Sequence, residues 1–184
     1  MIKENSCLIV IDIQNQFVND LPEEMNGKEV VKNACKVIQK FREEKKNIVF
    51  FREVHRKNIV DFGRELDGDE KIHCIEGTKE ADYVPEIKPA DNGLEFEMTK
   101  RRYSCFFATD LNILLKGLKT ENLYIIGLLS DVCVHYTSAD AHQHDFHIKV
   151  IKEACGGSSV KAHNAAMEAI EYLQHGSVIS VNEL

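Results

Sequence analysis

The chain has 184 residues, of which 43% are apolar and 29% charged, and its formal net charge is −7 at pH 7. This length is enough for one domain around one hydrophobic core. The acidic balance argues against a nucleic-acid partner, because phosphate binding needs a basic face, and against attraction to anionic membranes.

The apolar run at residues 7–13 is too short to span a bilayer and does not have the form of a secretory signal peptide. The six cysteines include no CxxC pair and follow no regular spacing, so we expect free thiols in a reducing compartment. Together these features predict a cytoplasmic protein.

Six short apolar segments have the composition of strands that are buried on both faces of a parallel sheet. They are residues 7–13, 47–53, 94–99, 122–127, 147–151 and 177–181. Segments with helical periodicity alternate with them, at residues 28–45, 109–118, 131–143 and 159–175. We therefore predict a single α/β domain over residues 1–184, with three α/β/α layers and a six-stranded parallel Rossmann-like sheet.

The segment 54–93 is long, polar and without regular pattern, which is typical of a functional loop in a compact domain. Polar or reactive side chains also follow four of the predicted strands: Asp12 and Gln14, Glu53 and His55, Lys100, and Cys133. Ligands of open α/β sheets bind at the carboxyl ends of the strands, so we expect these side chains to share one edge of the sheet.

Cys133 lies in GLLSDVCV, which reads as a strand-to-helix turn. With Ser130 as the N-cap, Cys133 is the third helical residue, and the helix N-terminus should lower the pKa of its thiol. The free N–H groups of that first turn could also hold an oxyanion. The alternative is a buried structural cysteine.

Asp12 interrupts an apolar strand, and a buried carboxylate is costly unless it is paired. It could be a turn or capping residue, although the pattern predicts no helix directly after it. Lys100 is a suitable partner, since its charge would keep Asp12 ionised. The alternative for Lys100 is a solvated lysine beside Arg101 and Arg102.

Three segments, LIVIDIQNQF, TKRRYSCFFATDL and GLLSDVCVHYTSADA, together resemble the isochorismatase-like cysteine hydrolases, a family that includes nicotinamidases and other amidases of small molecules. The segments occur in the family's order and spacing, and the resemblance covers nearly the whole chain. It implies a catalytic triad of Asp12, Lys100 and Cys133, with a thioester on Cys133 and Asp12 as the general base and acid.

The resemblance further implies an oxyanion hole formed by the N–H groups of Cys133 and Leu129, and a cis peptide bond between Leu128 and Leu129. Phe17 and Tyr103 match aromatic positions that line the substrate pocket in similar proteins. Packing in the core or at a subunit interface would account for these two side chains equally well.

A metal site is implied by the likeness to nicotinamidases, which bind a divalent metal through an Asp-x-His pair and a further histidine. His55 matches the pair, and His73 in HCIEGT matches the further histidine, but Glu53 stands at the aspartate position. These three residues could hold zinc, manganese or iron, and no organic cofactor is implied. Asp61 is a second candidate ligand.

The alternative to a metal is that Glu53 pairs with Arg56 or Arg64 and that the two histidines make ordinary polar contacts. For function, we predict hydrolysis of a C–N bond in a small amide. Ureido or carbamoyl substrates remain open, as does a non-catalytic ligand-binding module. Cys133 argues against an isochorismatase-type reaction, because those enzymes lack the cysteine. The resemblance also implies a homodimer or homotetramer.

Overall fold

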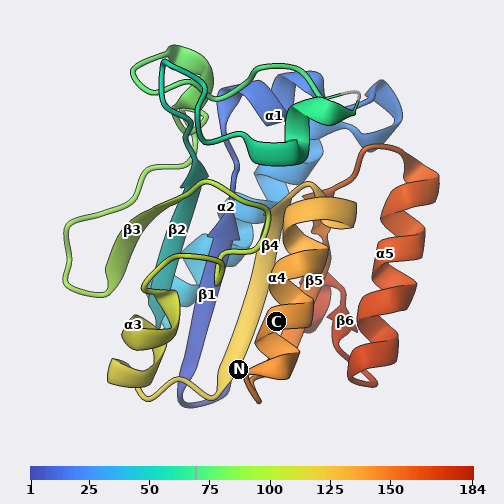
Figure 1. Ribbon diagram of the computed structural model, residues 1–184. Helices are drawn as coiled ribbons and strands as arrows, with labels where there is room; N and C mark the ends of the chain where they lie inside the picture. Colours follow the sequence, from blue (N-terminus) through green and yellow to red (C-terminus); the bar gives the residue numbers. More distant parts are fainter. Residues whose placement is uncertain (69) are drawn as a thin grey trace.

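Six parallel strands form one sheet in the computed structural model, which describes residues 1–68 and 70–184 (Figure 1). They are β1 (Ser6–Ile11), β2 (Asn47–Glu53), β3 (Glu95–Lys100), β4 (Asn122–Leu128), β5 (His147–Gly156) and β6 (Val178–Ile179). Their spatial order is β3-β2-β1-β4-β5-β6. The predicted six-stranded parallel sheet is confirmed, although β5 runs five residues beyond its expected end.

Burial along the strands follows the sequence pattern that predicted them. Every residue of the central strands β1 and β4 is buried, as their continuous apolar composition requires. Ile9 of β1 is in register with Val49 of β2 on one side and Ile125 of β4 on the other. The edge strand β3 alternates apolar and polar side chains and is mostly half-buried or exposed.

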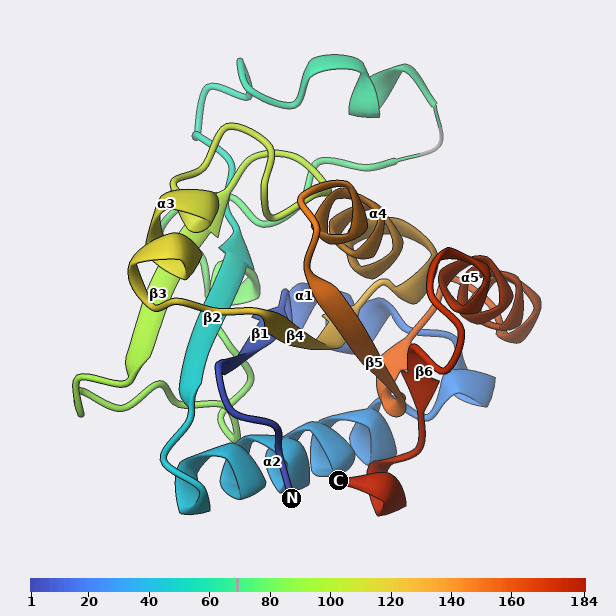
Figure 2. The ribbon, with the colours of Figure 1, turned by 90° about the horizontal axis from the view of Figure 1, so that it is seen from below.

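Helices cover both faces of the sheet, which confirms the predicted three layers (Figure 2). The helices are α1 (Asn15–Asp20), α2 (Gly27–Glu43), α3 (Leu111–Gly117), α4 (His135–Gln143) and α5 (Val160–Leu173). On one face, α2 packs Val37 and Phe41 against Leu8 of β1 in a buried cluster. On the other face, α3, α4 and α5 cover a second buried cluster built around Ile9 and Ile125.

The sequence pattern missed a short helix, α1, which begins at Asn15 with Gln14 as its N-cap, so Asp12 itself caps no helix. The six residues of α1 are too few to display a helical period, and Phe17 and Val18 are its only large apolar side chains.

The long segment between β2 and β3 lies over the carboxyl ends of the strands (Figure 1). Its described residues contain only two short 3₁₀ turns, Gly63–Asp67 and Lys79–Ala81. Isolated bridges join Gln14 to Tyr83 and His55 to Ile75, so the segment is fastened to the sheet edge at two points. Among the described residues, no helix combines the length and the apolar character that a membrane crossing needs.

Gly127 in β4 has a φ of 132°, and a Cβ built there would lie 2.0 Å from the carbonyl oxygen of Ile11 in β1. We predict that Gly127→Ala lowers the free energy of unfolding by about 3 kcal/mol or more, through backbone strain and overpacking. Urea unfolding measures this loss. Gly117→Ala is the matched control, because a Cβ at Gly117 meets nothing within 4 Å, and its stability should stay within about 1 kcal/mol of wild type. Equal stability of both variants would contradict the prediction.

Candidate active site

One buried ammonium group joins three other buried side chains at the carboxyl end of the sheet. Lys100 Nζ lies 2.7 Å from Asp12 Oδ2, 2.5 Å from Glu53 Oε2 and 3.3 Å from Cys133 Sγ. None of the four residues is more than 5% exposed. The structure therefore brings together Asp12, Lys100 and Cys133, and the alternative of Lys100 as a solvated surface lysine is wrong.

Lys100 and the two carboxylates beside it stabilise each other's ionised forms. Burial lowers the pKa of Lys100, but the neighbouring Asp12, Cys133 and Glu53 outweigh burial and raise it well above its usual value. Burial opposes ionisation of Glu53, yet Lys100 and hydrogen bonds from both histidines hold the Glu53 pKa well below its usual range.

Asp12 is less strongly compensated than Glu53. Burial raises the pKa of Asp12 to about 6, with Lys100 opposing this shift and Glu53 adding to it. Asp12 Oδ1 has no hydrogen-bond partner among the described residues. At neutral pH this group is therefore a carboxylate with an oxygen free to accept a proton.

The expected activation of Cys133 by a helix start is wrong. Burial raises the pKa of its thiol well above the usual value; Lys100 opposes the shift, and Asp12 and Glu53 add to it. Since the side chain is buried beside two carboxylates, the thiol stays protonated at neutral pH. A base is therefore needed to take its proton.

Ser130 does not cap the helix that carries Cys133, so the prediction of Ser130 as the N-cap is also wrong. Its hydroxyl instead hydrogen-bonds to His163 Nδ1 at 3.0 Å. Residues Ser130–Val134 form a π-helical turn, in which the N–H groups of Val132 and Val134 both donate to Leu129 O at 3.1 Å. The expected cis peptide bond between Leu128 and Leu129 is present immediately before this turn.

Gln14 fixes the backbone of Glu53 through a two-way hydrogen-bond pair. The Glu53 N–H donates to Gln14 Oε1, and Gln14 Nε2 donates to Glu53 O, both at 2.8 Å. Nε2 also donates to Ala81 O at 2.8 Å, which ties in the long loop. The sequence placed Gln14 after the first strand but gave no sign of this role.

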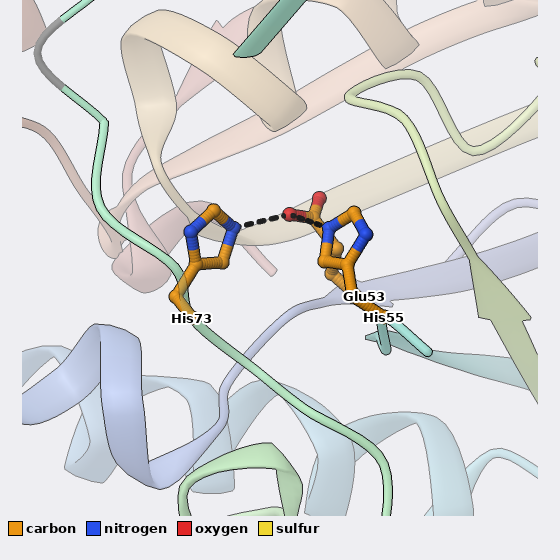
Figure 3. Close-up of side chains that lie close together, drawn as sticks. All are labelled: Glu53, His55 and His73. Carbon is orange, nitrogen blue, oxygen red and sulfur yellow. Dashed lines mark hydrogen bonds and ion pairs between the residues drawn. The ribbon is translucent and has the colours of Figure 1, made fainter. Parts of the chain in front are cut away.

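Glu53, His55 and His73 form a compact group of metal-ligand type, and Figure 3 shows the two imidazoles on either side of the carboxylate. Glu53 Oε1 lies 2.9 Å from His73 Nε2 and 3.4 Å from His55 Nε2. The ligand atoms of the three residues lie within 4.8 Å of one another. These donors fit a divalent metal, because both Nε2 atoms are aimed at one carboxylate oxygen.

The outer nitrogens of the two imidazoles are held by other groups, as is usual for metal-binding histidines. His55 Nδ1 lies 3.3 Å from Asp61 Oδ1, and His73 Nδ1 lies 2.7 Å from Lys71 O. Asp61 thus supports His55 from outside the ligand group, in contrast to its expected role as a ligand. Burial lowers the pKa of His73, but the hydrogen bond to Glu53 outweighs this effect, and the pKa is raised to about 9.

The alternative partners of Glu53 are also wrong. Arg56 Nη1 lies 2.7 Å from Asp61 Oδ2, and Arg64 Nη1 lies 2.8 Å from Asp67 Oδ2. Both arginines form ion pairs with other carboxylates on the loop surface. The contacts of the Glu53 carboxylate are therefore with the two histidines and Lys100.

A cavity of about 610 Å³ opens onto Cys133. Phe17, Tyr103 and Leu129 line it, together with Glu53 and His73. The described lining is completed by Gln16, Asp20, Pro22, Glu65, Glu70, Lys71, Ile72, Val132 and Ser158. The volume is in the range of small-molecule sites, and the cavity reaches both the thiol and the group of possible metal ligands.

A family model described as the isochorismatase domain matches residues 6–183, which is nearly the whole chain. The chain belongs to the isochorismatase family. Members of this family are hydrolases, so this chain is assigned to hydrolytic chemistry.

Three relatives illustrate the range of the family. A pyrazinamidase of Pyrococcus horikoshii, solved in complex with zinc, is 27% identical with a TM-score of 0.83, covering 96% of this chain and 99% of that one. A probable inactive nicotinamidase of Arabidopsis thaliana is 27% identical over 168 residues, 88% of this chain and 85% of its own. A ureidoacrylate amidohydrolase of Acinetobacter baylyi is 26% identical over 192 residues, 91% of this chain and 78% of its own.

Glu65 lines the cavity but was not a candidate from the sequence. It lies in a 3₁₀ turn of the long loop, where no strand end or periodic pattern marks a position as inward-facing. No sequence signal available in a single chain would have singled it out from the many acidic residues of this segment.

Removing the side-chain amide of Gln14 should leave the buried N–H and C=O groups of Glu53 without partners. We predict that Gln14→Ala lowers the free energy of unfolding by about 2–4 kcal/mol. Urea unfolding tests this, with Gln39→Ala as control. The side chain of Gln39 makes an exposed hydrogen bond to Glu43, so its loss should change stability by less than about 0.5 kcal/mol. A Gln14→Ala protein as stable as the control would show that the pair contributes little.

Proposed function

We propose that this chain is a cysteine amidohydrolase that cleaves the C–N bond of a small amide such as nicotinamide. The observation that carries the proposal is the contact of Cys133 Sγ with Lys100 Nζ at 3.3 Å, beside the free oxygen of Asp12 and at the wall of the cavity. A merely structural cysteine would need neither the buried ion pair nor the adjoining cavity.

In the proposed reaction, Asp12 takes the thiol proton as Cys133 Sγ forms a bond to the amide carbonyl carbon. The backbone N–H groups of Cys133 and Leu129 would hold the resulting oxyanion. Collapse of this intermediate breaks the C–N bond, and the proton on Asp12 passes to the departing nitrogen. A thioester on Cys133 remains.

Hydrolysis of the thioester reverses these roles. Asp12 takes a proton from the attacking water, the C–S bond breaks, and the proton returns to the sulfur as the acid product leaves. Lys100 remains charged throughout, and its position between Asp12 and Cys133 would stabilise negative charge as it moves from one to the other.

Glu53, His55 and His73 are the residues that would hold zinc, manganese or iron, since their donor set suits these metals. A metal bound there would supply a Lewis acid at the cavity wall. The chain's own contribution is to orient the two imidazoles through Asp61 and Lys71 O, and to keep Glu53 ionised through Lys100.

A second candidate is hydrolysis of a ureido or carbamoyl compound by the same cysteine chemistry. The likeness to a ureidoacrylate amidohydrolase favours it, because this relative matches over 91% of the chain. The steps at Cys133 and Asp12 would be unchanged, and only the group beyond the scissile bond would differ.

Loss of the thiol should abolish catalysis. We predict that Cys133→Ala lowers the rate of ammonia release from nicotinamide by at least about 10³-fold, since it removes the nucleophile. Cys35→Ala is the matched control, because Cys35 lies outside the cavity on α2, and its activity should equal wild type. Ammonia release that persists in Cys133→Ala would disprove the proposed nucleophile.

Metal affinity should depend on the ligands and also on the groups that hydrogen-bond to them from outside the site. We predict that the chain binds a single zinc ion by calorimetry and that His73→Ala weakens binding more than about 100-fold. Asp61→Asn should weaken it about 10- to 100-fold by loosening His55.

Asp67→Asn is the control for Asp61→Asn, because among the described residues Asp67 pairs only with the exposed Arg64. It should leave zinc affinity unchanged. Affinity unaffected by His73→Ala would place any bound zinc elsewhere in the chain.

A further inference from the structure

Two hydrogen-bonded contacts attach the turn that carries Cys133 to the chain after β5. Ser130 is fully buried, and its hydroxyl has His163 Nδ1 on α5 as its partner among the described residues, at 3.0 Å. The next residue, Asp131, accepts two hydrogen bonds from Ser158, one from the backbone N–H at 2.9 Å and one from the hydroxyl at 2.6 Å. We call these two contacts, Ser130 with His163 and Asp131 with Ser158, the turn clamp.

Gly157 allows the two segments of the turn clamp to approach each other. A Cβ built at Gly157 would lie 2.7 Å from Ser130 Oγ, 2.9 Å from Asp131 Oδ1 and 2.9 Å from His163 Cβ. These distances are shorter than van der Waals contact, so a side chain at this position would push the partners apart. The close approach is therefore built into the backbone between β5 and α5.

The turn clamp acts on the part of the chain that would carry out the chemistry. Ser130 directly follows Leu129, whose N–H is one of the two proposed donors to the oxyanion, and Asp131 lies two residues before Cys133. Leu129 and Cys133 line the cavity, whereas Ser130 and Asp131 are not among its described lining residues. The turn is thus held through two side chains that it does not offer to a substrate.

The contact between Ser130 and His163 joins two neutral groups. Burial lowers the pKa of His163, while Asp131 and Glu153 oppose this shift, so the imidazole is uncharged at neutral pH. An uncharged amide side chain can therefore take the place of the imidazole in this hydrogen bond.

We propose that His163 is a positioning residue, which holds the nucleophile turn through Ser130 and so keeps Cys133 Sγ and the Leu129 N–H in place for the substrate carbonyl. This inference rests on the proposed amidase function and deepens the account of the same site. A misplacement of about 1 Å at reacting groups can lower a rate about 10²-fold. Loss of this hydrogen bond should therefore affect turnover much more than substrate binding.

Leucine and asparagine at position 163 separate the hydrogen bond from packing, because both branch at Cγ as histidine does. His163→Leu removes the hydrogen-bonding atom, whereas His163→Asn places an amide oxygen or nitrogen at the site of Nδ1. Leucine is the better helix former, so a residue needed only for the stability of α5 would tolerate leucine better than asparagine. A positioning residue gives the opposite order.

Hydrogen exchange measures the opening of the turn without any substrate. We expect amide exchange in residues 129–134 to be about 10- to 100-fold faster in His163→Leu than in wild type, and close to wild type in His163→Asn. With nicotinamide, the kcat of His163→Leu should fall at least about 10-fold while KM changes less than about 3-fold, and His163→Asn should recover most of the loss. His175→Leu is the matched control, since His175 is exposed and does not line the cavity, and it should leave both measurements unchanged.

Exchange in the turn that is equal in wild type and His163→Leu, or raised equally by leucine and asparagine, overturns the inference. So does an unchanged kcat in an active His163→Leu enzyme. If the wild-type chain releases no ammonia, the amidase proposal fails, and the exchange rates alone decide for or against the turn clamp. If His163→Leu does not fold, Ser130→Ala removes the same hydrogen bond and takes its place.

Discussion

The site depends on the burial of one ammonium group, that of Lys100. Asp12 and Glu53 are both 1% exposed or less, and two carboxylates at this depth would otherwise be driven to bind protons. Lys100 Nζ touches both at 2.5–2.7 Å and reaches Cys133 Sγ as well. The charge of Lys100 thus allows two carboxylates, Asp12 and Glu53, to be buried together beside the thiol of Cys133.

The order of the strands explains how four residues so distant in sequence meet. Asp12 follows β1, and Cys133 follows β4, which are the neighbouring strands at which the chain changes direction across the sheet. Glu53 and Lys100 are in register at the ends of β2 and β3. This is the place where open α/β sheets bind ligands, so the fold supplies the cleft and the side chains supply the chemistry.

Glu53 joins the two halves of the site because of its length. One carboxylate oxygen faces the two histidines, and the other contacts Lys100 and lies 3.8 Å from Cys133 Sγ. A metal at Glu53, His55 and His73 would thus share a ligand with the partners of the nucleophile. Glu53, at the position where the resemblance implies an aspartate, thus presents one carboxylate oxygen to the histidines and the other to Lys100.

The sequence predicted the strands, the layers and the meeting of Asp12, Lys100 and Cys133, because buried strands and strand-end polar residues leave strong local patterns. It misjudged features that depend on distant neighbours. The pKa of Cys133 is raised by burial and by two carboxylates from other strands. The hydroxyl of Ser130 hydrogen-bonds to His163 on α5 instead of capping a helix. Glu65 lies on a loop whose path no periodicity describes.

The most direct test of the central claim is the stability of Lys100→Met, measured by urea unfolding at pH 8 and pH 5. The account predicts a loss of about 3–5 kcal/mol at the higher pH, because removing one partner leaves buried charges uncompensated. Without Lys100 the pKa values of Asp12 and Glu53 should rise above their unfolded values, so the penalty is relieved as pH falls and both carboxylates bind protons. A small loss, or one equal at both pH values, would contradict the dependence of the site on this cation.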